Sequence, residues 1–213
     1  MDRCISDKAQ ISFEGICVLK RDLRMRRIIN TLGEIARKSH GASMFEALVH
    51  SVISQQISTS AATTIRGRFI EMHPRKGFPT PLDVMNISTQ ELRKSGLSNA
   101  KATYIQELAQ SDINGSVPTL EDCALLDDSQ IIERLTQLKG IGLWSAQMVL
   151  IFNLNRPDVF PATDGGIVKA LGLIYFDGVI PTTNEALDCS IRWQPYRSLA
   201  SHYLWRALAT GIV

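Results

Sequence analysis

Two features of the chain could do chemistry, and they lie near each other in the sequence. The first is a turn made of Gly140, Ile141 and Gly142, and the second is a lone carboxylate, Asp164, in front of two further glycines. Glycines allow positive φ angles and a close approach of the backbone to a ligand. A helix that begins after such a turn presents unpaired N–H groups, which can hold a phosphate group with help from the helix dipole. Lys139, beside the turn, could add positive charge.

Both features also have a purely structural interpretation. The turn fits an ordinary helical hairpin in which a glycine ends the first helix. Asp164 precedes the helical pattern of residues 165–175, so its side chain could simply cap that helix. Capping is the usual use of an isolated aspartate in this setting, although Thr163 could make the cap and allow Asp164 to point elsewhere. The local pattern leaves these alternatives open.

Helical periodicity dominates the elements that would position these residues. Apolar residues recur at helical spacing in residues 45–53, 61–70, 104–109, 131–138 and 167–174. Residues 142–154 are apolar nearly all round, which predicts a buried central helix, and a last helix is expected over residues 196–210. Thr119 with Asp122 resembles a capping box. No convincing alternating strand is present, so the sequence predicts a nearly all-α protein.

The composition excludes several classes of protein. The 213 residues are 45% hydrophobic and 21% charged, which is ordinary for a globular protein. The net charge of +2 is too weak to indicate nucleic-acid binding by itself, and we interpret the basic segment "KRDLRMRR", residues 20–27, as a solvated helix face. The longest apolar run, near residues 148–152, is too short to span a membrane, and charged residues interrupt any signal-peptide core.

The cysteines do not form a metal-binding pattern. Cys4, Cys17, Cys123 and Cys189 include no CxxC pair, and their spacing suits neither zinc nor an iron–sulfur cluster. Free thiols in a reducing compartment are therefore expected.

Several segments taken together resemble the helix–hairpin–helix DNA glycosylase superfamily. "LKGIGLWSAQMVLIF" and "DVFPATDGGIVKAL" repeat the order of hairpin, Gly/Pro-rich loop and aspartate that is typical of that family. "FEALVHSVISQQIS", "GLSNAKATYIQELA" and "WQPYRSLASHYLW" are similar to the 3-methyladenine DNA glycosylase branch, which removes alkylated purines. The motifs occur in the family's order over roughly residues 44 to 206, and such a set is far more specific than any single motif.

The resemblance implies an enzyme that flips a damaged nucleotide out of duplex DNA and hydrolyses its N-glycosidic bond. It implies that Asp164 is the catalytic carboxylate, which stabilises the positive charge of the sugar as the base departs. Trp144 and Trp205 fall where relatives place aromatic residues of the base pocket, and an indole ring attracts a cationic base. DNA binding is assigned to the hairpin and the "SQQIS" segment, namely Lys139, Gly140, Ile141, Gly142, Gln55, Gln56 and Ile57. Gln56 is the first choice for the side chain that fills the gap in the duplex.

The resemblance also implies a subclass and a domain arrangement. Relatives with lyase activity attack the sugar with a lysine, whereas the matching position here is Trp144, which favours water as the nucleophile. We expect a two-lobed protein with its active site in the cleft between the lobes. Residues 44–156 would form the lobe with the hairpin, and residues 1–43 with 157–213 the lobe that carries Asp164.

The expected partner is double-stranded DNA that contains alkylated bases such as 3-methyladenine and 7-methylguanine. We expect a monomer that needs no metal or other cofactor and binds no membrane, although the resemblance allows a monovalent cation at the hairpin. The expected location is the cytoplasm (nucleoid) of a bacterium or the nucleus of a eukaryote. The alternatives are a non-catalytic helix–hairpin–helix module that only holds DNA, a glycosylase for deaminated or etheno-adducted bases, and a bifunctional glycosylase–lyase.

Overall fold

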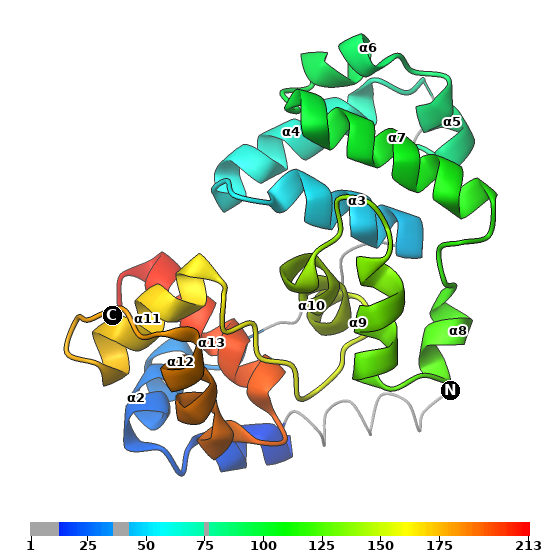
Figure 1. Ribbon diagram of the computed structural model, residues 1–213. Helices are drawn as coiled ribbons and strands as arrows, with labels where there is room; N and C mark the ends of the chain where they lie inside the picture. The colour runs from blue at the N-terminus through cyan, green and yellow to red at the C-terminus, as the bar shows by residue number, and fades with distance from the viewer. Residues whose placement is uncertain (1–12, 36–42, 75–76) are drawn as a thin grey trace. The chain divides into compact units, whose positions relative to one another are not determined.

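The computed structural model describes residues 13–35, 43–74 and 77–213, so Cys4 lies outside the described residues. The described chain is built from helices and contains no strand (Figure 1). The all-α prediction is therefore confirmed. The chain divides into two compact units, one formed by Lys38–Asn155 and the other by Met1–Arg37 with Arg156–Val213. The functional roles assigned to the two expected lobes stay predictions.

The unit formed by Lys38–Asn155 is organised around one buried helix, α3. Its helices are α3 (Met44–Ser54), α4 (Thr59–Glu71), α5 (Pro81–Met85), α6 (Thr89–Lys94), α7 (Asn99–Ile113), α8 (Leu120–Ala124), α9 (Asp128–Thr136) and α10 (Leu143–Phe152). The predicted apolar stripe of α3 is buried, and this helix packs against α4, α7 and α10. Helix α7 also lies against α5 and α6, as Figure 1 shows. Helix α10 packs on α9 as well as on α3, which fits its prediction as a buried helix.

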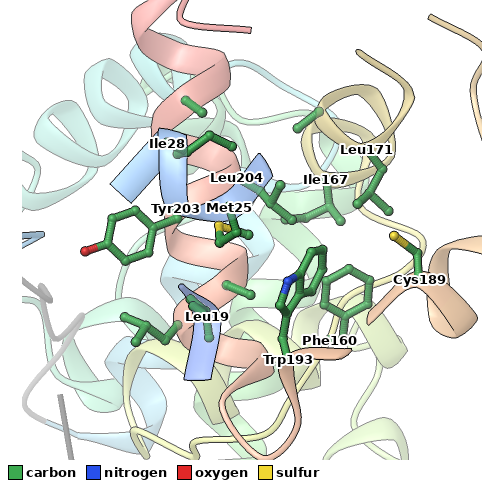
Figure 2. Close-up of a cluster of buried hydrophobic side chains, with 14 of the residues drawn as sticks. Leu19, Met25, Ile28, Phe160, Ile167, Leu171, Cys189, Trp193, Tyr203 and Leu204 are labelled. Atoms are coloured by element: carbon green, nitrogen blue, oxygen red, sulfur yellow. The ribbon is translucent and has the colours of Figure 1, made fainter. Parts of the chain in front are cut away.

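The second unit is organised around its last helix. Residues 13–19 are helical, and they are followed by α2 (Leu23–Leu32), α11 (Gly165–Tyr175), α12 (Thr183–Ser190), the 3-10 helix η1 (Ile191–Trp193) and α13 (Arg197–Thr210). Helix α13 packs against both α2 and α11. Figure 2 shows the core of this unit, in which the rings of Trp193 and Phe160 lie 5.9 Å apart beside Leu204 and Ile167. This core holds α11 and α13 together, and these helices carry Asp164 and Trp205 at their surfaces.

Capping explains the helices that periodicity missed. The predicted capping box of Thr119 and Asp122 is present, with both reciprocal hydrogen bonds. Two short helices, α6 and α12, are too short to show an apolar stripe, but each begins with a capping box, Ser88 with Glu91 and Thr182 with Glu185. Such a box satisfies two orphan donors, so it marks a helix start even where the apolar pattern is weak.

Four further predictions can be compared with the described residues. The predicted helix over residues 131–138 ends earlier, at Thr136, because the N–H of Leu138 bonds to Leu135 O three residues back, so the α-helical pattern is already broken there. Arg24, Arg26 and Arg27 of the basic segment are exposed, as expected of a solvated helix face. The described cysteines are free thiols. Within the described ranges, no helix is long and apolar enough to cross a membrane.

Candidate functional site

Asp164 both caps a helix and receives a second hydrogen bond. Its Oδ1 accepts the backbone N–H of Ile167 at 2.9 Å, so Asp164 is the N-cap of α11 and the alternative cap by Thr163 is wrong. The same oxygen accepts the indole N–H of Trp205 at 2.8 Å. The side chain is only partly buried. Two N–H donors on one carboxylate oxygen hold the group in a defined orientation, and hydrogen bonds to an ionised acceptor are among the strong ones.

A glycine makes room for this contact. A Cβ atom at Gly166 would lie 3.1 Å from Asp164 Oδ1 and 3.2 Å from Trp205 Cδ1, both tighter than ordinary van der Waals contact. The indole ring packs partly on the core of its unit, and His202 lies edge-on to it with ring centroids 5.9 Å apart. Glycine is therefore favoured at position 166 because the indole ring of Trp205 approaches the carboxylate of Asp164 closely there.

In the other unit, the Gly-Ile-Gly turn joins α9 to α10. Gly140 has φ +82°, and a Cβ atom there would lie 2.4 Å from Tyr104 Cγ, so both the backbone angle and the neighbouring ring require glycine. Ile141 is 4% exposed and donates its N–H to Leu138 O at 3.1 Å. The Ile141 side chain therefore anchors the turn in the core of its unit, and its amide is used within the turn.

Helix α10 begins without a side-chain cap. Its N-cap is Gly142, which is extended with φ −97° and ψ −179°. The first-turn amides of a helix have no acceptor within the helix, so an uncapped start is suited to an anion. Leu143 beside this start is 49% exposed, and Trp144 is partly buried. Phosphate binding at this turn stays a prediction, beside the alternative of an ordinary helical hairpin.

Lys139 has an acidic partner. Its Nζ donates to Glu107 Oε1 at 2.6 Å on the surface. The hydrogen bond to Glu107, together with the negative charge of that carboxylate, raises the pKa of Lys139. The amine therefore stays protonated and forms an ion pair with Glu107.

In the "SQQIS" segment, Gln55 is hydrogen-bonded to the hairpin, whereas Gln56 and Ile57 are exposed. Gln55 Nε2 donates to Gly140 O at 2.8 Å and to Ser145 Oγ at 3.0 Å, which ties the segment to the hairpin. Gln56 is exposed and has φ +55°, and Ile57 is 38% exposed. A non-glycine residue with positive φ is uncommon and often marks a functional position. Gln55 thus fixes the segment to the hairpin, whereas Gln56 stays the residue predicted to fill the gap in the duplex.

Comparison with known proteins decides the family. Residues 49–190, well over half of the chain, match the HhH-GPD superfamily base excision DNA repair protein. The chain belongs to the HhH-GPD superfamily. The matched residues include α9, the Gly-Ile-Gly turn, α10 and the partly buried Asp164.

Individual HhH-GPD relatives are similar over most of this chain. A DNA-3-methyladenine glycosylase 1 of Schizosaccharomyces pombe is 34% identical over 201 residues, which are 93% of this chain and 86% of that protein. The S. pombe 3-methyladenine DNA glycosylase in complex with abasic DNA has a similar structure, with a TM-score of 0.86 over 91% of this chain and 96% of that one. A DNA-3-methyladenine glycosylase of Bacillus subtilis is 28% identical over 81% of this chain and 62% of its own length.

The structure brings some predicted residues of this HhH-GPD chain together within each unit. Asp164 meets Trp205 in one unit, and Gln55 meets the hairpin in the other. Sequence reasoning missed the roles of Gly166 and Tyr104, because the residues that they contact, Trp205 and Gly140, are distant in the chain. The described residues include no group of histidine, cysteine, aspartate and glutamate side chains that could hold a metal ion.

Proposed function

We propose that this chain is a monofunctional DNA glycosylase that excises alkylated purines such as 3-methyladenine and 7-methylguanine from duplex DNA and so initiates base excision repair. The observation that carries the proposal is the pair of N–H donors on Oδ1 of Asp164. Membership of a base excision repair superfamily and similarity to proteins named DNA-3-methyladenine glycosylases support the same activity.

The proposed reaction needs one carboxylate. The bond between C1′ and the base nitrogen breaks, and its electron pair leaves with the base. An alkylated purine is already cationic, so it departs as a neutral molecule without a proton donor, while the sugar becomes oxocarbenium-like. Asp164, held in place before the reaction, stabilises this developing positive charge. Water, which the carboxylate orients, then attacks C1′ and gives up one proton to the solvent.

The proposed DNA contacts start at the hairpin. The uncapped first turn of α10 offers main-chain amides to a phosphate group, beginning after Ile141 because that residue's N–H is used within the turn. Lys139 adds positive charge and exchanges Glu107 for a phosphate. Such backbone contacts position DNA without reading its sequence, and they explain how a chain with a net charge of only +2 could bind it.

A monovalent cation could join this contact. The oxygens available are main-chain carbonyls, and those of Leu138 and Gly140 each accept one hydrogen bond, from Ile141 at 3.1 Å and from Gln55 at 2.8 Å. A carbonyl oxygen has two lone pairs, so each retains capacity for a hard cation. These residues fit such an ion, which would supply positive charge for a phosphate.

Water is favoured over lysine as the nucleophile. By the resemblance, Trp144 falls at the position where lyase-active relatives carry the attacking lysine. Lys139 is a poor substitute, because its interaction with Glu107 raises its pKa and an ammonium group has no lone pair for attack. Borohydride should therefore trap no covalent adduct between the protein and DNA, and a trapped adduct would support the glycosylase–lyase alternative.

The test of the proposed function is base release. Wild-type protein is incubated with methylated duplex DNA, and the released bases are identified by chromatography. Release of 3-methyladenine or 7-methylguanine supports the proposal. Release of only deaminated or etheno-adducted bases would point to another lesion class, and DNA binding without release of any base would favour the non-catalytic module. An enzyme of this kind would act as a monomer at the DNA, in the nucleoid of a bacterium or the nucleus of a eukaryote.

Trp205→Phe should separate two roles of this tryptophan. The phenyl ring keeps an aromatic face, but the N–H donor to Asp164 is lost. Because a hydrogen bond to a charged group contributes about 1.5–3 kcal/mol, we expect kcat to fall roughly ten- to hundredfold, with KM nearly unchanged. A rise in KM with kcat unchanged would mean instead that the ring, through its attraction for the cationic base, is the functional part.

A further inference from the structure

The ammonium group of Lys101 contacts the loop that carries Gln56, and the proposed chemistry does not use it. Lys101 lies in the first turn of α7 and is partly buried. Its Nζ donates to Ile53 O at 2.9 Å and to Gln55 O at 2.7 Å. Both acceptors are main-chain carbonyls where α3 ends and the "SQQIS" segment begins. The lysine therefore acts on the backbone of this segment and not on another side chain.

The position suits a cation. The last carbonyls of a helix have no partner within the helix, and the C-terminal end of the helix dipole is negative. Lys101 supplies donors for these carbonyls from a neighbouring helix. Burial removes the ammonium group in part from water, and this desolvation lowers the pKa of Lys101. Its hydrogen bonds to the loop offset that cost of desolvation.

The loop is held from two directions. Lys101 holds its main chain, while the side chain of Gln55 is bound to Gly140 O and Ser145 Oγ at the hairpin. The next residue, Gln56, is exposed and has φ +55°. Residues other than glycine adopt that conformation at a cost, and such strain persists only where the surroundings impose it. Here the two sets of contacts on Gln55 impose it.

We infer that Lys101 is a positioning residue, which holds residues 53–57 in the conformation that presents Gln56 to the gap left by a flipped base. The inference rests on the proposed function, because a gap forms only if a base is flipped out. Flipping a base is unfavourable, and a side chain that fills the gap offsets part of that cost. A loop that is already ordered avoids losing conformational entropy when DNA binds.

The first test compares duplex with single-stranded substrate. Lys101→Met keeps the length of the side chain and removes every donor. We expect excision of 7-methylguanine from duplex DNA to fall about ten- to hundredfold, the size of effect that follows the loss of hydrogen bonds to a charged group. Excision from a single strand of the same sequence should change little, since it contains no gap to fill. Equal losses on both substrates, or no loss on the duplex, would overturn the inference.

Two variants serve as controls. Lys94→Met removes an exposed lysine of α6 and should leave both activities unchanged. Lys101→Arg keeps a charged donor, and recovery of most of the duplex activity is expected. If Lys101→Met lowers the melting temperature strongly, the comparison of substrates is made with Lys101→Arg instead. Any loss of activity that remains in Lys101→Arg should then be confined to duplex DNA. An equal loss on duplex and single-stranded DNA would contradict the positioning role.

A double-mutant cycle asks whether Lys101 acts through Gln56. In a Gln56→Ala background there is no side chain to present, so Lys101→Met should cause no further loss on duplex DNA. Two additive losses would show that Lys101 acts elsewhere, which overturns the inference.

A readout without catalysis separates this inference from the proposed function. A 2-aminopurine base is placed opposite an abasic-site analogue in duplex DNA, and its fluorescence reports insertion of a side chain into the stack. Wild-type protein should change the fluorescence, and both Lys101→Met and Gln56→Ala should reduce that change. This result would support the inference even if no base release were found, whereas an unaltered signal in Lys101→Met would overturn it even in an active enzyme.

Discussion

Replacing Asp164 with asparagine should lower the rate of base excision about a hundred- to a thousandfold, while duplex DNA binding stays intact. Asparagine keeps an oxygen that can accept the N–H groups of Ile167 and Trp205, which now meet at Oδ1. It is also as good an N-cap as aspartate, so α11 should remain stable. What is lost is the negative charge that the proposed reaction places beside C1′, and preorganised electrostatic stabilisation is commonly the largest single contribution to catalysis, with a loss of about 10²–10³ for one group alone.

The measurement is single-turnover excision from a duplex that contains one 7-methylguanine, with affinity for an abasic-site duplex measured in parallel. Asp164→Ala is the informative companion, because it removes the cap as well and should cost about 1 kcal/mol of stability in addition to activity. Wild-type excision by Asp164→Asn would mean that the residue only caps α11. Loss of DNA binding together with excision would mean that the carboxylate serves the fold and not the reaction.

Gly140→Ala should destabilise the hairpin by about 2–5 kcal/mol, because two separate costs combine. The first is the positive φ of +82°, which a residue with a Cβ atom adopts reluctantly. The second is the position of that Cβ atom, only 2.4 Å from Tyr104 Cγ. Either α7 or the turn has to move, so the uncapped start of α10 would lose its geometry. Binding of duplex DNA should therefore fall even at temperatures where the variant remains folded.

Gly115→Ala serves as a control that carries only the conformational cost of a positive φ. Gly115 has φ +73°, but a Cβ atom there would meet nothing within 4 Å. This variant should lose only the conformational part, about 1–2 kcal/mol, and keep its affinity for DNA. Urea unfolding of both variants gives the two free energies. If the two variants lose equal stability, the Tyr104 side chain moves aside at no cost in free energy. The close contact of α7 with the hairpin is then not a reason for glycine at position 140.

The elements that follow local rules could be predicted from sequence. The stripe of α3 and the all-apolar character of α10 come from the helical period, and the start of α8 comes from the capping pair Thr119 and Asp122. The boundary of α9 was wrong because the N–H of Leu138 bonds to Leu135 O three residues back, which periodicity does not reveal. Helices α6 and α12 were not predicted because they are too short to show an apolar stripe.

Part of the candidate site could likewise be predicted from the sequence, and part required the structure. The positions of Asp164, Gly140 and Gly142 are visible as unusual residues at helix starts, and their order along the chain supports the family. Whether Asp164 or Thr163 caps α11 could not be decided locally, because both have the chemistry of a cap. The finding that the cap and the indole N–H meet at one oxygen required coordinates.

The sequence by itself determined the helical class, the order of the motifs and the family, because these depend on residue type and on spacing along one helix. Only the tertiary structure decided that Trp205 donates to Asp164, that Tyr104 crowds Gly140 and that Lys101 holds Gln55. Each of these contacts joins helices that are distant in the chain. Their distances depend on how whole helices pack, and local periodicity indicates which face is buried but not which residue of another helix meets it.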